Sequence, residues 1–125
     1  MQTPVIAIVD DDESVCLGMT SLMRSLGYDV LTYGSAEDFL RSQERHGTSC
    51  LISDVQMPGV GGLELQQILL AEGSRLPIIF ITAFPDARVQ QQAMQAGATC
   101  FLSKPFEGDT LIHCLESVLG GGGAA

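Results

Sequence analysis

Short apolar runs alternate along the chain with longer stretches whose apolar residues recur at helical spacing. The runs are rich in Val, Ile, Leu and Phe and are bounded by polar or turn residues, which is typical of β-strands. The first and fourth runs are apolar without alternation, as in a parallel strand covered on both faces, whereas the second is mixed and suits a sheet edge. The expected strands cover residues 5–9, 30–33, 50–53, 78–81 and 100–102.

The stretches between these strands carry helical periodicity with recognisable ends. In the first stretch, apolar residues from Val15 to Leu26 recur every three or four positions, and Gly27 follows as a C-terminal stop. Ser35 and Asp86 are placed to cap the second and fourth helices. The other helices are indicated by Leu65, Ile68 and Leu69, which end near Gly73, and by Leu111, Ile112, Leu115, Val118 and Leu119.

Strands that alternate five times with helices predict an α/β fold, a single (βα)5 domain with an open, doubly wound parallel sheet and helices on both faces. Five units are too few for an eight-stranded closed barrel. We expect the domain to cover residues 1–119. Residues 120–125 read as a flexible Gly-rich tail, either the beginning of a linker or a cloning remnant.

The composition narrows the setting of this domain. Its 125 residues carry a formal net charge of −9, which argues against direct binding of nucleic acid. The chain has no apolar run near the ~18 residues that span a bilayer, and its first residues lack the basic and apolar parts of a secretory signal. We therefore expect a cytoplasmic protein that does not bind membranes.

The four cysteines, Cys16, Cys50, Cys100 and Cys114, are scattered along the chain without a C-x-x-C pair. This spacing indicates neither a zinc site nor a disulfide framework. We expect each of them to be a small buried apolar residue.

Polar residues follow four of the expected strands, at the edge where ligands bind in sheets of this kind. The first strand is followed by the acidic run 10–12, the third by Asp54, the fourth by Thr82 and the fifth by Lys104. Carboxylates gathered at one edge do not all stay ionised without a cation, and their hard oxygen atoms suit Mg²⁺. Together with an ammonium and a hydroxyl group, they suit phosphoryl transfer, with Asp54 as the nucleophile.

An acidic run after a strand has a simpler interpretation as a solvated loop or a helix cap. Asp12 and Glu13 fit that interpretation, because acidic residues favour the first turn of a helix. The matching groups at the other strand ends favour a site role for Asp10 and Asp11. Lys104 is the only lysine among six basic residues, so its position at a strand end favours a specific role for a compact ammonium.

The motifs IVDDD at 8–12, SDVQMPGVGG at 53–62, FITA at 80–83 and SKPF at 103–106 resemble those of the receiver domain of two-component response regulators. The resemblance covers residues 4–119 and is greatest to the FixJ-type branch. It implies a flavodoxin-like sheet with strand order 2-1-3-4-5, as in other receivers. It also implies a signalling domain rather than an enzyme, with weak self-phosphorylation and self-dephosphorylation. A sensor histidine kinase would be the partner, and a DNA-binding domain outside this sequence would control transcription.

The resemblance assigns roles to the site residues. Asp54 is the expected phosphoacceptor, and Asp10 and Asp11 are the expected Mg²⁺ pair, with Asp11 as the direct ligand. Gln56 is expected to offer its backbone carbonyl to the metal, for which Mn²⁺ is an alternative. Asp12 receives no role from the resemblance.

Other residues are expected to change the surface after phosphorylation. Thr82 resembles the switch hydroxyl, Lys104 the lysine that pairs with the phosphoryl group, and Phe101 the switch aromatic, although Phe101 also suits an ordinary core position. The bond before Pro105 is expected to be cis. The altered surface would involve the fourth helix, the fifth strand and the fifth helix. Its neutral polar face suits a phosphorylation-dependent homodimer and consists of Gln90, Gln91, Gln92 and Gln95.

Three other functions fit parts of the pattern. A small phosphohydrolase of the haloacid-dehalogenase type would use Asp10 as nucleophile, but the acids that follow Lys104 directly, Glu107 and Asp109, lie at the start of an expected helix rather than in a further metal-binding motif. A flavin- or nucleotide-binding module is disfavoured by the acidic first turn, which would repel a phosphate. A receiver that binds partners without phosphorylation remains a third reading of the same residues.

Overall fold

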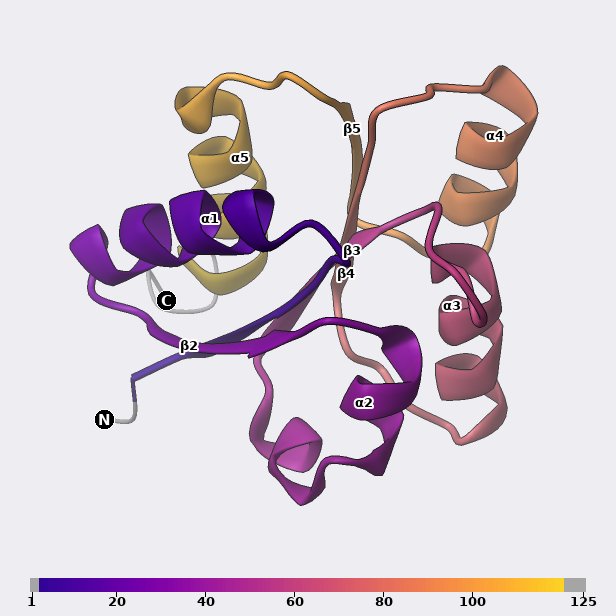
Figure 1. Ribbon diagram of the computed structural model, residues 1–125, viewed down its shortest axis with the longest axis horizontal. Helices are drawn as coiled ribbons and strands as arrows, with labels where there is room; N and C mark the ends of the chain where they lie inside the picture. Colours follow the sequence, from indigo (N-terminus) through magenta and orange to yellow (C-terminus); the bar gives the residue numbers. More distant parts are fainter. Residues whose placement is uncertain (1–2, 121–125) are drawn as a thin grey trace.

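A five-stranded parallel sheet runs through the middle of the computed structural model, which describes residues 3–120 (Figure 1). Its strand order is β2-β1-β3-β4-β5, which confirms the predicted doubly wound, flavodoxin-like sheet. Residues 121–125 of the predicted tail lie outside the described residues, whereas Gly120 belongs to the last helical turn. The strands are β1 (Val5–Val9), β2 (Asp29–Tyr33), β3 (Cys50–Asp54), β4 (Ile78–Thr82) and β5 (Cys100–Ser103).

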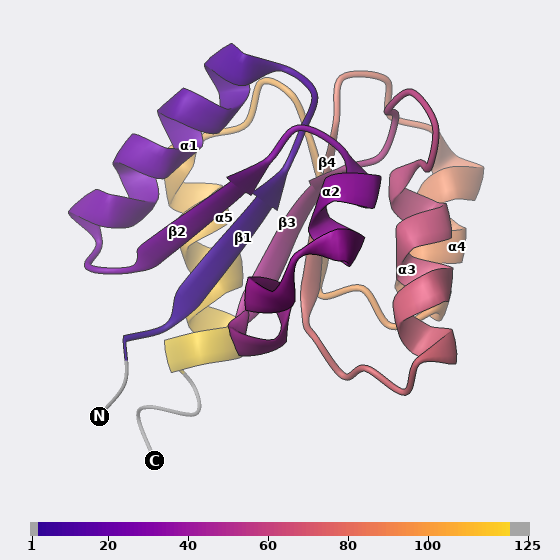
Figure 2. The same cartoon turned by 60° about the horizontal axis from the view of Figure 1, so that its bottom comes forward.

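Helices cover both faces of the sheet, with α1 and α5 on one face and α2, α3 and α4 on the other (Figures 1 and 2). The helices are α1 (Glu13–Ser25), α2 (Ala36–Arg41), α3 (Gly62–Ala71), α4 (Ala87–Gln95) and α5 (Gly108–Leu115). A 3₁₀ turn, Gln43–Gly47, follows α2, and a π-helical turn, Glu116–Gly120, extends α5. In the described part of the chain, no helix is long and apolar enough to cross a membrane.

The helix caps lie where the sequence places them. The carboxylate of Asp86 accepts from the backbone N–H of Arg88 at 2.8 Å, and the Ser35 hydroxyl accepts from that of Asp38 at 3.1 Å. Gly27, with φ of 90°, follows α1 in the left-handed region that glycine tolerates best. These contacts confirm the predicted helix boundaries because each satisfies a backbone group that the helix itself leaves free.

Each face of the sheet has its own apolar core. The α1–α5 side is built around the isoleucines of β1, β3 and β4, and the other side around Phe39 and Phe80. Strands β3 and β4 are buried at every position, whereas β2 is mixed and lies at an edge, as its composition predicts. This double burial fixes the central strands, and it is at their carboxyl ends that the acidic residues lie.

The prediction for the cysteines is wrong for one pair. Cys100 on β5 and Cys114 on α5 form a disulfide, with their Cα atoms 6.4 Å apart. Cys16 and Cys50 are free and buried, as expected. The spacing along the chain gives no sign of the bond, because two cysteines with a sequence separation of 14 meet only when α5 folds back onto β5.

Gly62, the first residue of α3, allows this helix to begin directly against the end of β3. A Cβ atom at this position would lie 2.5 Å from the Asp54 carbonyl oxygen and 2.9 Å from the Val55 Cα. The same Cβ would lie 3.1 Å from the ring of Phe80. Two of these neighbours are backbone atoms that cannot move without moving Asp54 itself.

We expect Gly62→Ala to lower the free energy of unfolding by about 3 kcal/mol, because the added methyl group overlaps fixed backbone. Gly18→Ala is the matched control: Gly18 lies within α1, and a Cβ there meets nothing within 4 Å. The control should stabilise the protein by roughly 0.5–1 kcal/mol. Urea denaturation measures both values, and equal effects of the two substitutions would contradict the close approach at Gly62.

Candidate functional site

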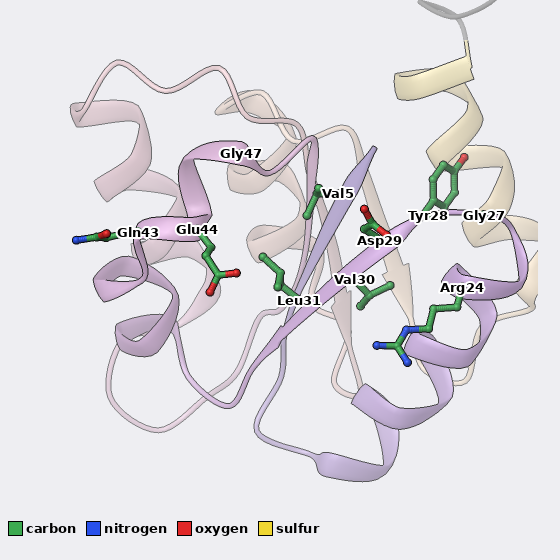
Figure 3. A pocket seen from close by; sticks show the side chains of 10 residues that line it. All are labelled: Val5, Arg24, Gly27, Tyr28, Asp29, Val30, Leu31, Gln43, Glu44 and Gly47. Carbon is green, nitrogen blue, oxygen red and sulfur yellow. The ribbon is translucent and has the colours of Figure 1, made fainter. Parts of the chain in front are cut away.

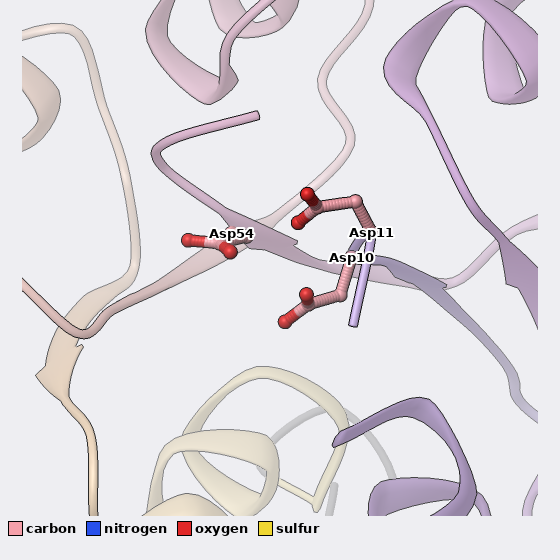
Figure 4. Close-up of side chains that lie close together, drawn as sticks. All are labelled: Asp10, Asp11 and Asp54. Atoms are coloured by element: carbon pink, nitrogen blue, oxygen red, sulfur yellow. The ribbon is translucent and has the colours of Figure 1, made fainter. Parts of the chain in front are cut away.

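Three carboxylates meet at the carboxyl ends of β1 and β3 (Figure 4). One carboxylate oxygen from each of Asp10, Asp11 and Asp54 lies within 4.8 Å of the others. Asp10 and Asp54 are buried, whereas Asp11 is exposed on the solvent side of the group. The structure therefore brings together the three acids that the sequence predicts as a metal site.

Lys104 supplies the positive charge beside these acids. Its Nζ atom donates to Asp10 Oδ2 at 3.0 Å and to Asp54 Oδ2 at 3.4 Å. The Lys104 backbone N–H donates to the Thr82 carbonyl at 2.7 Å, which continues the pairing of β4 with β5 and fixes the base of the side chain. The position of Lys104 agrees with the sequence prediction. One ammonium cannot balance three ionised carboxylates, so the excess negative charge of the site favours a cation.

Burial and neighbouring charges shift the pKa values of Asp54 and Lys104. Burial and the neighbouring Asp10 carboxylate raise the pKa of Asp54, against the opposing effects of Lys104 and the Gln56 N–H. Burial lowers the pKa of Lys104, but its contacts with Asp10 and Asp54 outweigh that effect, so that the pKa is raised. Lys104 therefore stays charged at neutral pH, and the charge on Asp54 is held in an unfavourable environment.

In the acidic run 10–12, Asp10 and Asp11 belong to the carboxylate group of the site, whereas Asp12 caps α1. The carboxylate of Asp12 accepts from the backbone N–H of Ser14 at 2.9 Å and of Val15 at 3.4 Å, and so caps the helix. The Asp12 N–H in turn donates to Asp10 Oδ1 at 2.8 Å. Helix capping thus explains Asp12, for which the resemblance gave no role, and it helps to orient Asp10.

The donor set suits Mg²⁺. All three acidic side chains present oxygen ligands, and the exposed Asp11 leaves one side open to the water molecules that Mg²⁺ usually keeps. The Gln56 N–H donates to Asp54 Oδ1 at 3.3 Å, which holds the start of the β3–α3 loop against the site. The use of the Gln56 carbonyl as a further ligand stays a prediction.

Thr82 ends β4 and is 1% exposed. Its Oγ1 atom accepts from the Phe84 N–H at 3.0 Å. A hydroxyl group has one proton and two lone pairs, so this contact leaves the Thr82 proton available to an oxygen acceptor. Thr82 therefore lies at the predicted strand end, and its hydroxyl group can still donate a hydrogen bond.

Phe101 lies on β5 directly opposite Phe80, with ring centroids 6.4 Å apart and the planes tilted by 52°. It packs against the core on the α4 side of the sheet and is half-buried. A core role is therefore observed, and the switch role of Phe101 stays a prediction. The Lys104–Pro105 peptide bond is cis, as expected.

One residue that supports this site, Glu37, is not among the residues predicted from the sequence. Glu37 on α2 reaches across to the β3–α3 loop, where its Oε2 accepts from the Val60 N–H at 3.5 Å. A Cβ on Gly59 would overlap the same oxygen, so the carboxylate lies directly against this glycine. No local pattern signals this contact, because α2 and the loop meet only in the folded sheet.

A groove elsewhere on the molecule offers no comparable chemistry. It runs along the edge of β2, with Val30 and Leu31 in its wall and Arg24 and Glu44 on opposite sides (Figure 3). Val5, the first residue of β1, also lines it. The groove therefore lies at the amino ends of these strands, away from the carboxyl ends that carry the acids.

The geometry disfavours a phosphohydrolase that uses Asp10 as nucleophile. Both Asp10 oxygens accept short hydrogen bonds, from Lys104 at 3.0 Å and from the Asp12 N–H at 2.8 Å, whereas the matching contacts of Asp54 are longer, 3.4 Å and 3.3 Å. Glu107 and Asp109 are exposed around the start of α5, and the metal-ligand cluster found among the described residues does not include them. Asp54 belongs to the same carboxylate group and is held less tightly by hydrogen bonds than Asp10.

Comparison with known proteins agrees with this geometry. Residues 6–116 match the family model described as the response regulator receiver domain. The chain is 42% identical over 111 residues to Nodulation protein W of Bradyrhizobium diazoefficiens, with 89% of this chain and 49% of that protein covered. It is 36% identical over 114 residues to the transcriptional regulatory protein FixJ of the same organism, with 91% and 56% covered.

A solved structure of the response regulator StyR superposes with a TM-score of 0.87 at 42% identity, covering 95% of this chain and 60% of that one. The chain spans about half the length of the curated relatives that it matches.

The raised pKa of Asp54 predicts how stability depends on pH when metal is chelated. The folded protein binds a proton at Asp54 more tightly than the unfolded chain does, so ionisation of this residue lowers stability. As the pH rises, this loss of stability begins near 3.8, the ordinary pKa of an aspartate, and is complete above the raised pKa of Asp54 in the folded protein. Asp54→Asn should therefore be more stable than the wild type at about pH 7.5, and the difference should shrink towards about pH 4.

Urea unfolding with EDTA at several pH values measures this difference. Asp29→Asn is the matched control, because Asp29 is an exposed carboxylate on the edge strand β2. A difference between Asp54→Asn and the wild type that stays constant with pH would show that charge at Asp54 is not its cause.

Proposed function

This chain belongs to the response-regulator receiver family, in its FixJ-type branch, and from that premise we propose that Asp54 accepts a phosphoryl group in a magnesium-dependent reaction. Receiver domains are signalling domains that sensor histidine kinases phosphorylate, and they bind Mg²⁺ through an acidic cluster of this kind. One observation carries the proposal: Asp54 lies beside two further carboxylates and 3.4 Å from the ammonium of Lys104.

The chain's own residues divide the reaction between them. An Asp54 carboxylate oxygen forms the new bond to phosphorus while the bond between phosphorus and the donor breaks. Lys104, already in contact with Asp54, is placed to pair with an oxygen of the arriving group. Thr82, whose proton is not used in its contact with Phe84, would donate it to another phosphoryl oxygen.

Asp10, Asp11 and Asp54 would hold the metal, with the Gln56 carbonyl as a further ligand. When bound, Mg²⁺ supplies positive charge that stabilises the phosphoryl oxygens. Mn²⁺ is an alternative, because it takes the same oxygen ligands. The same residues would give the domain weak self-phosphorylation from small donors and slow self-dephosphorylation.

The setting follows from charge and from the relatives. We place the protein in the cytoplasm, where a kinase could reach it. A net charge of −9 makes direct binding of nucleic acid unfavourable. The curated relatives are about twice as long and include transcriptional regulators. The output would therefore be transcription, controlled through a DNA-binding domain outside this sequence.

Incubation with a small phosphodonor and Mg²⁺ should add about 80 Da, the mass of one phosphoryl group, to the wild-type protein. Asp54→Asn should abolish the gain because it removes the nucleophilic oxygen, and EDTA should abolish it because the carboxylates then repel the donor. Intact-mass spectrometry measures both results.

Asp38→Asn is the matched control, since Asp38 is an exposed carboxylate on α2 that lies outside the site. It should gain the same mass as the wild type. A gain that persists in Asp54→Asn and disappears in Asp10→Asn would favour the phosphohydrolase reading. No gain in the wild type would favour a receiver that acts without phosphorylation.

We further propose that the phosphoryl group changes the surface formed by α4, β5 and α5. Movement of Thr82 toward the phosphoryl group would leave space into which the half-buried Phe101 could turn. The glutamines at 90, 91, 92 and 95 are all exposed on α4, and Met94 between them is 42% exposed. A neutral face with an apolar side chain can approach a copy of itself without charge repulsion, which supports a weak symmetric homodimer.

Phosphorylated wild type should therefore sediment with a higher average mass than the unphosphorylated protein at about 0.1 mM, where even a weak dimer is populated. Thr82→Ala should accept the phosphoryl group but lose most of the change in mass. Thr32→Ala, at an exposed position on β2 at the opposite edge of the sheet, serves as the control. A phosphorylated wild type that stays monomeric would contradict the dimer, although not the phosphorylation.

A further inference from the structure

The Cys100–Cys114 disulfide is partly exposed to solvent at Cys100, whereas the free cysteines Cys16 and Cys50 are buried. Its two residues lie on different elements, β5 and α5, with Cα atoms 6.4 Å apart, inside the usual range for a disulfide. Cys114 is 7% exposed and packs in the core between the sheet, α1 and α5, whereas Cys100 at the sheet edge is half-buried. A reagent in solution would therefore reach the bond from the Cys100 side.

The disulfide is placed next to the ring that would move in the phosphorylation switch. Successive side chains of a strand point to opposite faces. Cys100 and Leu102 pack on the α5 side of β5, while Phe101 packs on the α4 side, opposite Phe80. The bond therefore ties β5 to α5 at the residue directly before Phe101.

The bond also encloses the lysine of the site. Its two cysteines are separated by 14 positions, and the intervening chain contains Lys104 and Pro105. Closing a loop in this way removes conformations from the segment that it bounds. With the bond present, Lys104 Nζ already lies 3.0 Å from Asp10 and 3.4 Å from Asp54. The closed loop is thus compatible with an assembled site.

We propose that Cys100 and Cys114 are a reversible thiol–disulfide site that controls whether phosphorylation of Asp54 reaches the α4–β5–α5 surface, an inference that rests on the proposed function. In the disulfide form, Asp54 still accepts the phosphoryl group, because Lys104 is in place. The strand β5 is then held to α5 and cannot shift as Phe101 turns. In the dithiol form, β5 is released and the surface responds.

The reaction partner is a low-molecular-weight disulfide such as glutathione disulfide. The Cys100 thiolate attacks one sulfur of that disulfide, a mixed disulfide forms, and one glutathione thiolate leaves and takes up a proton. The Cys114 thiolate then attacks the Cys100 sulfur, and the second glutathione leaves in the same way. Two protein thiols are oxidised and one glutathione disulfide is reduced to two glutathiones, with two protons passing from the cysteines to glutathione.

The proposed cytoplasmic location favours a reversible role. Disulfides in that compartment are mostly transient and serve catalysis or redox sensing, because thiols are kept reduced there. In the described part of the chain, the other two cysteines, Cys16 and Cys50, are buried and are not disulfide-bonded. Burial raises the pKa of the Cys50 thiol to about 12, so its thiolate scarcely forms at neutral pH.

The first measurement counts thiols without reference to phosphorylation. The protein is equilibrated with glutathione disulfide or with excess glutathione, unfolded in acid, and alkylated for mass spectrometry. We expect two labels in the oxidised sample, on Cys16 and Cys50, and four in the reduced one. Four labels in both samples would overturn the site, and so would two labels in both.

The second measurement follows hydrogen–deuterium exchange in the peptides that cover β5 and α5, with and without phosphodonor. In the reduced protein, phosphorylation should change exchange there by about threefold or more, and in the oxidised protein by much less. Cys100→Ser should respond like the reduced protein in either buffer. Cys50→Ala is the matched control and should keep the dependence on glutathione.

Intact mass in the same samples separates the two proposals. A gain of about 80 Da in both redox states with an equal exchange response, or with no response in either, overturns the redox control. A gain in the reduced state alone overturns it as well, because oxidation would then act on phosphorylation itself. No gain in either state contradicts the phosphoacceptor role of Asp54, and the thiol count then decides the redox site by itself.

Discussion

The burial of two carboxylates beside one lysine is the constraint on which the rest of this domain depends. Asp10 is 1% exposed and Asp54 7%, and Lys104 lies within 3.4 Å of both. Removing such charges from water is costly unless they are paired and hydrogen-bonded. Each carboxylate also accepts a backbone N–H, from Asp12 and Gln56 respectively. These hydrogen bonds and the ammonium of Lys104 stabilise the buried carboxylates, and the negative charge that remains favours binding of a further cation.

The sheet makes this constraint possible. β1 and β3 are adjacent and parallel, so their carboxyl ends lie side by side and deliver Asp10 and Asp54 to one place. β4 and β5 deliver Thr82 and Lys104 to the same edge, and the Lys104 N–H continues their pairing. Two further residues contact the segment that follows β3. Gly62 lets α3 begin directly against Asp54, and Glu37, which is distant in the sequence, accepts a hydrogen bond from the β3–α3 loop.

Features with a local cause could be predicted from the sequence. Apolar runs gave the strands, and Ser35 and Asp86 marked helix starts because a cap acts within three residues of itself. The positions of the site residues could also be predicted from the sequence, since each residue lies at the end of a strand and the carboxyl ends of parallel strands share one edge. The cis bond before Pro105 and the strand order required the family resemblance, because neither follows from composition or periodicity.

Features that depend on the meeting of distant elements could not be predicted in this way. The contact of Glu37 with the β3–α3 loop joins residues 23 positions apart, and no local pattern anticipates it. Cys100 and Cys114 looked like two isolated apolar residues, because a pair separated by 14 positions carries no signal without the turn of α5 onto β5. The close approach at Gly62 is of the same kind, because the glycine is visible in the sequence but the backbone that it accommodates is not.

The strand β5 shows how these two classes of feature combine. Its four residues, Cys100–Ser103, lead directly into Lys104, so the strand that positions the ammonium also carries the aromatic ring and the disulfide. The two faces of the strand have different neighbours: Phe101 meets the α4 side, and Cys100 is bonded to the α5 side. A shift of an edge strand disturbs a ladder on one side only, because β5 pairs with β4 alone. Of the two edge strands, β5 is the one that leads into the site through Lys104, so a shift of β5 would disturb only its hydrogen bonds to β4.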